Sequence, residues 1–249
     1  MSAYERFAEY YDRLTVDADY KSRGAFFDKI IKQNFPKAEL LLDLACGTGS
    51  LSMEMSKYGY DIIGVDSSED MLAAAMQKMP EFAGSVMFLC QTAQNLDLYG
   101  TIDACVCSLD SLNHLPDEKA LEAAISRVSL FMNPGGVFLF DLNTLHKHRD
   151  ILADSTFAYE HDDFLCLWRN SFDSKDGSVE ILLDFFDRTS GNNYKRYSEN
   201  FSEQFFDSSL VLSLLKKYSM ELLNIYDGDS FTAPQDDSQR LLYTAIKKD

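Results

Sequence analysis

Short apolar runs alternate with amphipathic stretches over the first 144 residues of the chain. Five apolar runs that end at turn signals are predicted to be strands, at 40–45, 61–65, 86–90, 102–108 and 137–142. Three stretches with apolar residues at three- and four-residue steps are predicted to be helices, at 50–58, 67–79 and 116–132. One or two further helices are expected before residue 36. This alternation predicts right-handed crossovers and a mainly parallel sheet.

The pattern changes after Asn143, where only strand signals follow for about sixty residues. Four such segments are separated by turn-forming Asp, Gly and Asn residues, at 157–162, 164–172, 178–186 and 194–206. They predict an antiparallel β insertion over 145–206. A helix at 208–218 and two strands at 221–226 and 240–247 then complete a seven-stranded sheet. The predicted fold class is therefore α/β, a doubly wound and mostly parallel sheet with an insertion after the fifth strand.

Charge and hydropathy narrow the classes of partner. The formal net charge is −17, and a field of that sign repels phosphate backbones and anionic lipids, so neither nucleic acid nor a membrane is expected as partner. No uninterrupted apolar run reaches the roughly 18 residues of a membrane-spanning helix. The first residues mix charges with aromatics and lack the basic-then-apolar order of a secretory signal, which predicts a cytoplasmic location.

Cysteine and histidine positions argue against a metal site. The five cysteines include no CxxC pair, so Cys105 and Cys107 are interpreted as small apolar side chains in a reducing compartment. His146 and His148 form a basic spot with their neighbours, but a metal site would need more ligands nearby. We interpret that spot as a substrate-edge or surface feature.

A glycine-rich corner follows the first predicted strand and carries the strongest chemical signal. Asp43 comes near the end of the strand, and Gly47 and Gly49 permit a tight turn that lets the backbone approach a ligand. The helix beyond supplies unpaired N–H groups. A dinucleotide fingerprint would have a third glycine where this chain has Ser52. A carboxylate at this corner suits a cationic ligand better than a pyrophosphate.

Asp66 ends the second predicted strand, 17 residues after Gly49. A carboxylate in this register accepts hydrogen bonds from the two ribose hydroxyls of an adenosine ligand. This signal alone would serve a nicotinamide cofactor equally well. Met71 and Leu72 follow and offer an apolar wall to an adenine ring.

These motifs together resemble a known family. The segments Asp43-Leu-Ala-Cys-Gly-Thr-Gly49 and Gly64-Val-Asp66, with Asn133-Pro-Gly-Gly136 before the fifth strand, resemble class I S-adenosylmethionine-dependent methyltransferases. The opening Tyr4-x-x-Phe7-Ala-x-x-Tyr10-Tyr11-Asp-x-Leu14 resembles a small-molecule subgroup that includes sugar-amine N-methyltransferases. That subgroup also places an antiparallel insertion after the fifth strand.

The resemblance implies S-adenosylmethionine as cofactor, bound in a Rossmann-like domain over 1–144 and 207–249, with 145–206 as a substrate lid. It assigns the methionine end of the cofactor to Asp43, Ala45, Gly47 and Gly49, and the ribose to Asp66 and Ser67. The loop with Thr92, Ala93 and Gln94 would flank the adenine, beside the apolar wall expected from Met71, and Ser108 would make a first contact after the fourth strand. The family often has an acid early in the loop after the third strand, where this chain has Gln91 or Thr92. Tyr11 is added because an aromatic face attracts a sulfonium as it does an ammonium.

The candidate catalytic residues lie in Cys107–Leu115, a segment too polar for a buried strand. His114 matches a histidine of the sugar N-methyltransferases, and Asp110 lies one helical turn before it. Either side chain could take a proton from the acceptor or only orient it. A capping or surface histidine and a turn acid are the alternative interpretations.

Three functions remain open at this point. The first is methyl transfer to a small-molecule amine or hydroxyl, the second is an NAD(P)-dependent oxidoreductase, and the third is a cofactor-binding protein without catalysis. The polar segment 108–114 disfavours the third function, and Ser52 with Asp43 disfavours the second. Exposed strand edges in the insertion would allow two chains to pair as a homodimer.

Overall fold

The computed structural model describes residues 7–191 and 193–248, so Tyr4 of the opening motif lies outside the described residues. A mixed sheet forms the body in the order β10-β11-β5-β4-β1-β2-β3, in which only β11 runs antiparallel to its neighbours. Its strands are β1 (Leu40–Leu44), β2 (Asp61–Asp66), β3 (Val86–Cys90), β4 (Ile102–Cys107), β5 (Met132–Asn143), β10 (Met220–Asp227) and β11 (Arg240–Lys247). The order reverses beside β1, which creates the crevice where open α/β sheets bind ligands.

Helices cover both faces of this sheet. The apolar faces of α2 (Tyr20–Asn34) and α3 (Ser50–Ser56) pack on one side, and those of α5 (Glu118–Phe131) and α6 (Ser208–Lys217) pack on the other. α4 (Glu69–Gln77) lies against β2 and β3 at the edge of the sheet. Both hydrophobic layers are closed by fully buried side chains, such as Phe27 in α2 and Ile125 in α5. This packing holds the carboxyl ends of the parallel strands in one row.

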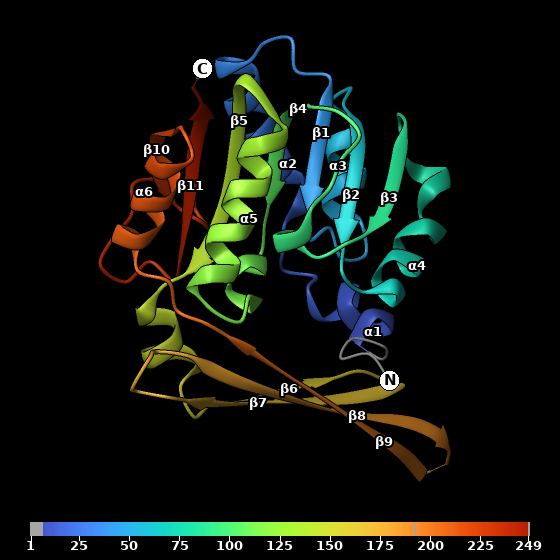
Figure 1. Cartoon of the computed structure of the whole chain (residues 1–249). Helices are drawn as coiled ribbons and strands as arrows, with labels where there is room; N and C mark the ends of the chain where they lie inside the picture. Colours follow the sequence, from blue (N-terminus) through green and yellow to red (C-terminus); the bar gives the residue numbers. More distant parts are fainter. Residues whose placement is uncertain (1–6, 192, 249) are drawn as a thin grey trace.

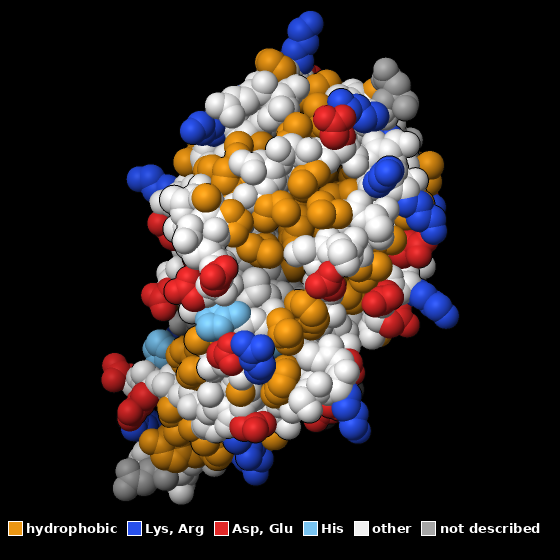
Figure 2. All heavy atoms as spheres, turned by 90° about the vertical axis from the view of Figure 1, so that its left-hand side faces the viewer, with side chains coloured by type: hydrophobic (Ala, Val, Ile, Leu, Met, Phe, Trp, Pro, Cys, Tyr) orange, Lys and Arg blue, Asp and Glu red, His pale blue; other side chains and the backbone are white. Residues whose placement is uncertain are grey.

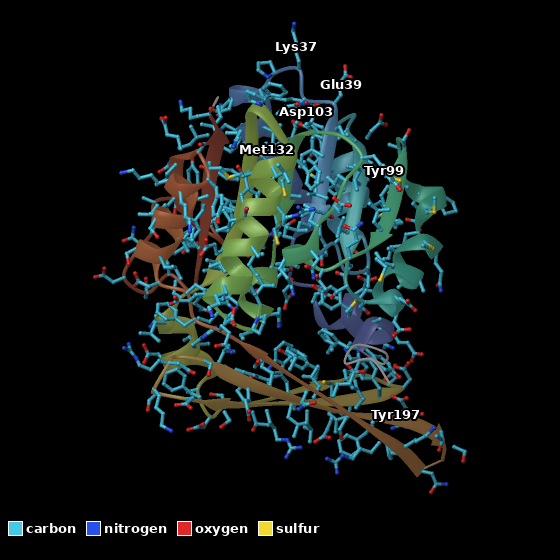
Figure 3. All side chains as sticks on the ribbon, viewed as in Figure 1. Lys37, Glu39, Tyr99, Asp103, Met132 and Tyr197 are labelled. Carbon is cyan, nitrogen blue, oxygen red and sulfur yellow. The ribbon has the colours of Figure 1, made fainter. Side chains whose placement is uncertain are left out.

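A second, four-stranded antiparallel sheet lies across that row of strand ends (Figure 1). Its strands follow in sequence order as β6 (Thr156–Glu160), β7 (Phe164–Phe172), β8 (Val179–Ser190) and β9 (Asn193–Glu203). The short helix α1 (Phe7–Leu14) lies between the two sheets and packs Phe7 and Ala8 into the apolar inner face of the second sheet. The amino ends of the parallel strands, where Asp103 and Met132 lie, are at the opposite end of the molecule (Figure 3).

The predicted fold class is confirmed, and the differences are local. β5 begins at Met132, five residues earlier than predicted, because Met132 pairs with Ile102 of β4 before the glycine turn. The predicted helix 67–79 ends at Gln77, and Pro80 then lies in a 3₁₀ turn. The segment before β6 holds a π-helical turn, Lys147–Leu152, that strand patterning did not predict.

The outer surface shows where further contacts could form. A hydrophobic groove between α6 and β10 is lined by Leu212, Leu215 and Met220, and Figure 2 shows hydrophobic side chains gathered on this side of the body. β6 and β9 are the edge strands of the second sheet, so the edges on which the homodimer prediction depends are present. The homodimer itself stays a prediction. Among the described residues no helix is both long and apolar enough to cross a membrane.

Candidate cofactor and acceptor site

The glycine corner between β1 and α3 turns through three residues with left-handed backbone. Ala45, Gly47 and Gly49 have φ of 58°, 53° and 72°. Glycine is needed at 49 also for space, because a Cβ there would lie 3.1 Å from the Cβ of Ala75 in α4. The backbone N–H of Cys46 donates to the carbonyl of Val65 in β2 over 2.9 Å, which fixes the corner against the second strand.

A cavity of about 130 Å³ opens at this corner. The predicted cofactor residues Tyr11, Ala45, Gly47, Asp66, Ser67 and Met71 line this cavity. The rest of its lining is Phe7, Leu109, Ser111 and His114. These residues come together because the parallel strands β1, β2 and β4 end at the same edge of the sheet, where α1 also lies. The predicted residues Gly49, Thr92, Ala93, Gln94 and Ser108 lie outside this lining.

Asp66 presents a carboxylate whose orientation is fixed by the backbone. Its Oδ2 accepts from the N–H of Gly47 over 2.8 Å, and its Oδ1 accepts from the N–H of Ser68 over 2.9 Å. Burial raises the pKa of Asp66 above its usual range, and these two N–H donors partly oppose that rise. Each carboxylate oxygen can accept more than one hydrogen bond, so the group retains capacity for a ligand hydroxyl.

Asp43 lies behind the corner and does not line the cavity. It is only 2% exposed, and its Oδ2 accepts from the hydroxyl of Ser52 over 2.5 Å. Burial raises the pKa of this carboxyl to about 7. Ser52, which stands where a dinucleotide fingerprint has its third glycine, therefore binds the acid of the corner. The two sequence features that disfavoured a nicotinamide cofactor are one hydrogen-bonded pair.

A second cavity of about 290 Å³ adjoins the first and lies under the four-stranded sheet. The two cavities share four wall residues, Phe7, Tyr11, Leu109 and His114. The lining of the second cavity also includes aromatic side chains of the insertion and several charged side chains: Tyr159, Trp168, Phe201, Asp17, Asp110, Lys147, Glu203 and Arg240. A reactive group on a ligand in one cavity can thus meet a ligand in the other across this shared wall.

Asp141, which sequence reasoning missed, organises the segment after β4. It is fully buried in β5 and accepts from Arg23 of α2, from the hydroxyl of Ser108 and from the N–H groups of Leu109 and Asp110. These contacts accompany left-handed backbone at Leu109 and Asp110, with φ of 59° and 54°. The available signal was an acid inside the apolar run 137–142.

The two candidate catalytic side chains have different surroundings. Asp110 forms an ion pair with Arg240 of β11. Burial acts to raise the pKa of Asp110, but the charges of Arg240 and Lys147 outweigh it and hold the pKa well below its usual range. His114 packs edge-on against Phe201 with ring centroids 5.2 Å apart. Its Nδ1 is buried and has no hydrogen-bond partner among the described residues.

The sequence places His148 in a substrate-edge or surface feature, and the surface alternative is wrong for this residue. The π-helical turn buries it completely. Its Nδ1 faces the carbonyl of Gly177 at 2.8 Å, and its Nε2 faces Oε2 of Glu203 at 3.1 Å. Sequence patterning could not find Glu203, because it reads as one more polar residue on an edge strand.

A doubly wound sheet, a glycine corner after its first strand and a buried acid at the end of its second define the class of enzyme domains that bind a nucleoside-containing cofactor. Comparison with known proteins identifies the enzyme family within this class. A family model described as a methyltransferase domain matches residues 41–136. A putative methyltransferase of Bacillus subtilis, YqeM, is 31% identical over 245 residues, which cover 98% of this chain and 97% of that protein. The chain belongs to the class I S-adenosylmethionine-dependent methyltransferases, and S-adenosylmethionine is its cofactor.

Other relatives support the subgroup. The crystal structure of an S-adenosylmethionine-dependent methyltransferase from Clostridium acetobutylicum superposes with a TM-score of 0.88 and 29% identity, covering 100% of both chains. A glycine/sarcosine N-methyltransferase of Halorhodospira halochloris is 30% identical over 70% of this chain and 69% of that protein. A dTDP-3-amino-3,6-dideoxy-α-D-glucopyranose N,N-dimethyltransferase of Streptomyces fradiae is 29% identical over 54% and 52%. The resemblance to sugar-amine methyltransferases is confirmed, and the oxidoreductase and non-catalytic alternatives fall away.

Proposed function

We propose that the chain transfers the methyl group of S-adenosylmethionine to the nitrogen of a small-molecule amine held in the second cavity. One observation carries the proposal: Asp110, His114 and Glu203 each bring a polar atom to within 4.8 Å of the others, in the cavity that shares a wall with the cofactor cavity. Two carboxylates beside an imidazole are suited to bind an amine and receive its proton. The N-methyltransferase relatives also support nitrogen as the acceptor.

The residues of the first cavity fit the cofactor. Asp66 and Ser67 would hold the ribose, and the left-handed backbone of Ala45 and Gly47 would hold the methionine end, with Asp43 and Gly49 supporting this corner from behind. Met71 would contact the adenine, flanked by the loop that carries Thr92, Ala93 and Gln94. Tyr11 would face the sulfonium, and Ser108 would fix the adjoining segment. When bound, the cofactor supplies a methyl group on a positively charged sulfur, already activated for displacement.

The protein therefore has to position the amine, take its proton and exclude water. We assign proton acceptance to His114, which lies in the shared wall and whose Nδ1 has no hydrogen-bond partner in the part of the chain that the structure describes. Asp110 orients the acceptor as a carboxylate, because its ion pair with Arg240 keeps it ionised. Residues 145–206 form the lid over the acceptor, and 1–144 with 207–249 form the cofactor domain.

Replacing His114 tests this assignment. H114Q should lower kcat by about 10²-fold or more and flatten the pH dependence of kcat, since the side chain no longer takes a proton. The affinity for S-adenosylmethionine, measured by calorimetry, should change little. H146Q is the matched control, because His146 pairs with Asp150 on the surface and should leave kcat unaltered.

The acceptor atom is tested with pairs of small molecules that differ only in an amine or a hydroxyl. Formation of S-adenosylhomocysteine and the mass of the product should show methylation of the amine member. Methylation of the hydroxyl member alone, or a fully active H114Q, would remove the proposal.

A further inference from the structure

Asn143, the last residue of β5, joins two oppositely charged side chains, Glu203 and Lys147, that line the acceptor cavity. Its Nδ2 donates to Oε2 of Glu203 over 2.7 Å, and its Oδ1 accepts from Nζ of Lys147 over 3.0 Å. Asn143 is 2% exposed, and its own N–H donates to Oδ1 of Asn113. The amide is thus fixed with its oxygen toward the ammonium and its nitrogen toward the carboxylate. One anion and one cation stand side by side in the same cavity.

The anion, Glu203, keeps one oxygen for a ligand. The side chain is buried, at 3% exposed, and lines the cavity. Oε2 takes both protein contacts, from Asn143 and from His148. Within residues 7–191 and 193–248, Oε1 makes no hydrogen bond. Oε1 is open to the cavity, so an N–H of a ligand can donate to this carboxylate oxygen without displacing a protein contact.

The charge of Lys147, the cation, acts on Asp110 but is not neutralised by an ion pair among the described residues. In the described part of the chain it has no carboxylate partner within ion-pair distance, and its hydrogen bond goes to the neutral oxygen of Asn143. Arg240, the other cation of the cavity, is neutralised by ion pairs with Asp110 and Asp229. A half-buried ammonium of this kind attracts an anion more strongly than it would in water.

We propose that the acceptor is a zwitterionic amine of amino-acid type, with its amine on Oε1 of Glu203 and its acidic group on Lys147. This rests on the proposed function, in that the amine so held is the one methylated. Once His114 has taken one proton from the ammonium, the two remaining N–H bonds point to Glu203 and Asp110, and the freed lone pair points toward the shared wall with the cofactor cavity. Tyr159, Trp168 and Phe201 enclose the apolar part of the molecule.

The charges of Glu203 and Lys147 together set the specificity for the acceptor. An amine that lacks an acidic group leaves Lys147 uncompensated, and a hydroxy acid offers Glu203 a single weaker donor. A site built to bind a polar group rejects the analogue without it far more strongly than a hydrophobic pocket rejects a size change. The carboxamide of each amino acid is therefore the discriminating probe, since it keeps size and amine but loses the negative charge.

Binding is tested with the protein saturated with S-adenosylhomocysteine, so that no turnover is needed. The probes are the twenty protein amino acids, sarcosine and β-alanine, each with its carboxamide, and the readout is calorimetry or saturation-transfer NMR. At least one amino acid should bind the wild type about tenfold or more tightly than its carboxamide. K147Q should abolish this preference, and K175Q, which replaces an exposed lysine in the turn before β8, should keep it.

E203Q tests the other half of the pair and should weaken amino acid and carboxamide alike. Thermal unfolding and the affinity for S-adenosylhomocysteine confirm that each variant is folded. If E203Q does not fold, the result for K147Q decides the test. The proposal is overturned if no amino acid binds, or if K147Q weakens amino acid and carboxamide equally. Amino acids that bind by these rules but are never methylated would contradict the proposed function and leave the zwitterion site standing.

Discussion

Thr48 donates its hydroxyl to Oδ1 of Asp12 over 2.6 Å, which ties helix α1 to the glycine corner. The same carboxylate accepts from Ser50 and forms an ion pair at 2.5 Å with Lys78, the residue after the end of α4. Asp12 therefore joins the helix that carries Tyr11 to two elements of the cofactor cavity. The opposite side of α1 contacts the second sheet, where the hydroxyl of Tyr10 donates to Asp187 over 2.6 Å.

Removing the Asp12 carboxylate should loosen α1 over the cofactor. D12N is expected to weaken S-adenosylmethionine binding by about tenfold, because hydrogen bonds to a charged group contribute roughly 1.5–3 kcal/mol. D163N is the matched control: it breaks the exposed ion pair between Asp163 and Arg13, the residue next to Asp12, and an exposed pair of this kind contributes little because water screens it. Calorimetry on both variants checks the difference, and equal affinities would contradict the role given to Asp12.

Asp43 should make stability fall as pH rises. Because burial raises its native pKa to about 7, the native state binds more protons than the unfolded chain between about pH 4 and pH 7. Its contribution is therefore present below pH 4 and is lost as pH rises through 7. D43N has no such proton, so its free energy of unfolding relative to wild type should increase over this window. Urea unfolding at pH 5, 6, 7 and 8 measures it.

Asp103 should change stability with pH in the opposite direction to Asp43. Burial acts to raise its pKa, but the N–H groups of Glu39 and Leu40 and the amide of Asn133 outweigh it and lower the pKa. Its stabilisation is present above the unfolded pKa and is lost as pH falls. D103N should therefore cost most at pH 7 and least in acid. A D43N curve parallel to that of D103N would show that Asp43 does not hold its proton.

Gly64 in β2 has no room for a methyl group. A Cβ there would lie 2.6 Å from the ring of Phe88 and 3.1 Å from Sγ of Cys46. G64A should therefore lower the free energy of unfolding by about 1–3 kcal/mol through overpacking. G100A, with nothing within 4 Å of its Cβ, should change stability by less than about 1 kcal/mol. Equal unfolding midpoints in urea would contradict the close packing of β2 on β3.

Asp141 should be the most costly acid to neutralise. D141N keeps the shape but removes the negative charge that faces Arg23 inside the protein, and breaking a buried pair costs about 3–5 kcal/mol. D97N, at an exposed pair with Arg127, should cost about 1 kcal/mol or less. Chemical denaturation compares the two variants. A small loss of stability in D141N would mean that Leu109 and Asp110 keep their backbone conformation without the Asp141 carboxylate.

Local pattern predicted the elements because each strand and helix follows from its own periodicity. The glycine corner and Asp66 were found because they lie within 24 residues of one another and carry a fixed spacing. Arg23, Asp141 and Arg240 were not found, since β5 and β11 bring them together from distant parts of the chain. No periodicity encodes a contact between residues 23 and 141.

The acceptor cavity was the least predictable part for the same reason. Lys147, His148 and Glu203 meet only because a π-helical turn, which no apolar pattern signals, rotates the first two inward against the edge strand. Strand alternation correctly gave the insertion its sheet, but a sheet has two faces. Only the packing of α1 on Phe164 and Phe185 shows which face looks toward the cofactor.

Phe7 and Tyr11 of α1 wall both cavities, so neither ligand can leave past this helix without disturbing the enclosure of the other. The consequence is kinetic. We expect compulsory-order turnover, in which the methyl donor enters first and its demethylated product departs last, with helix movement setting the pace of each cycle.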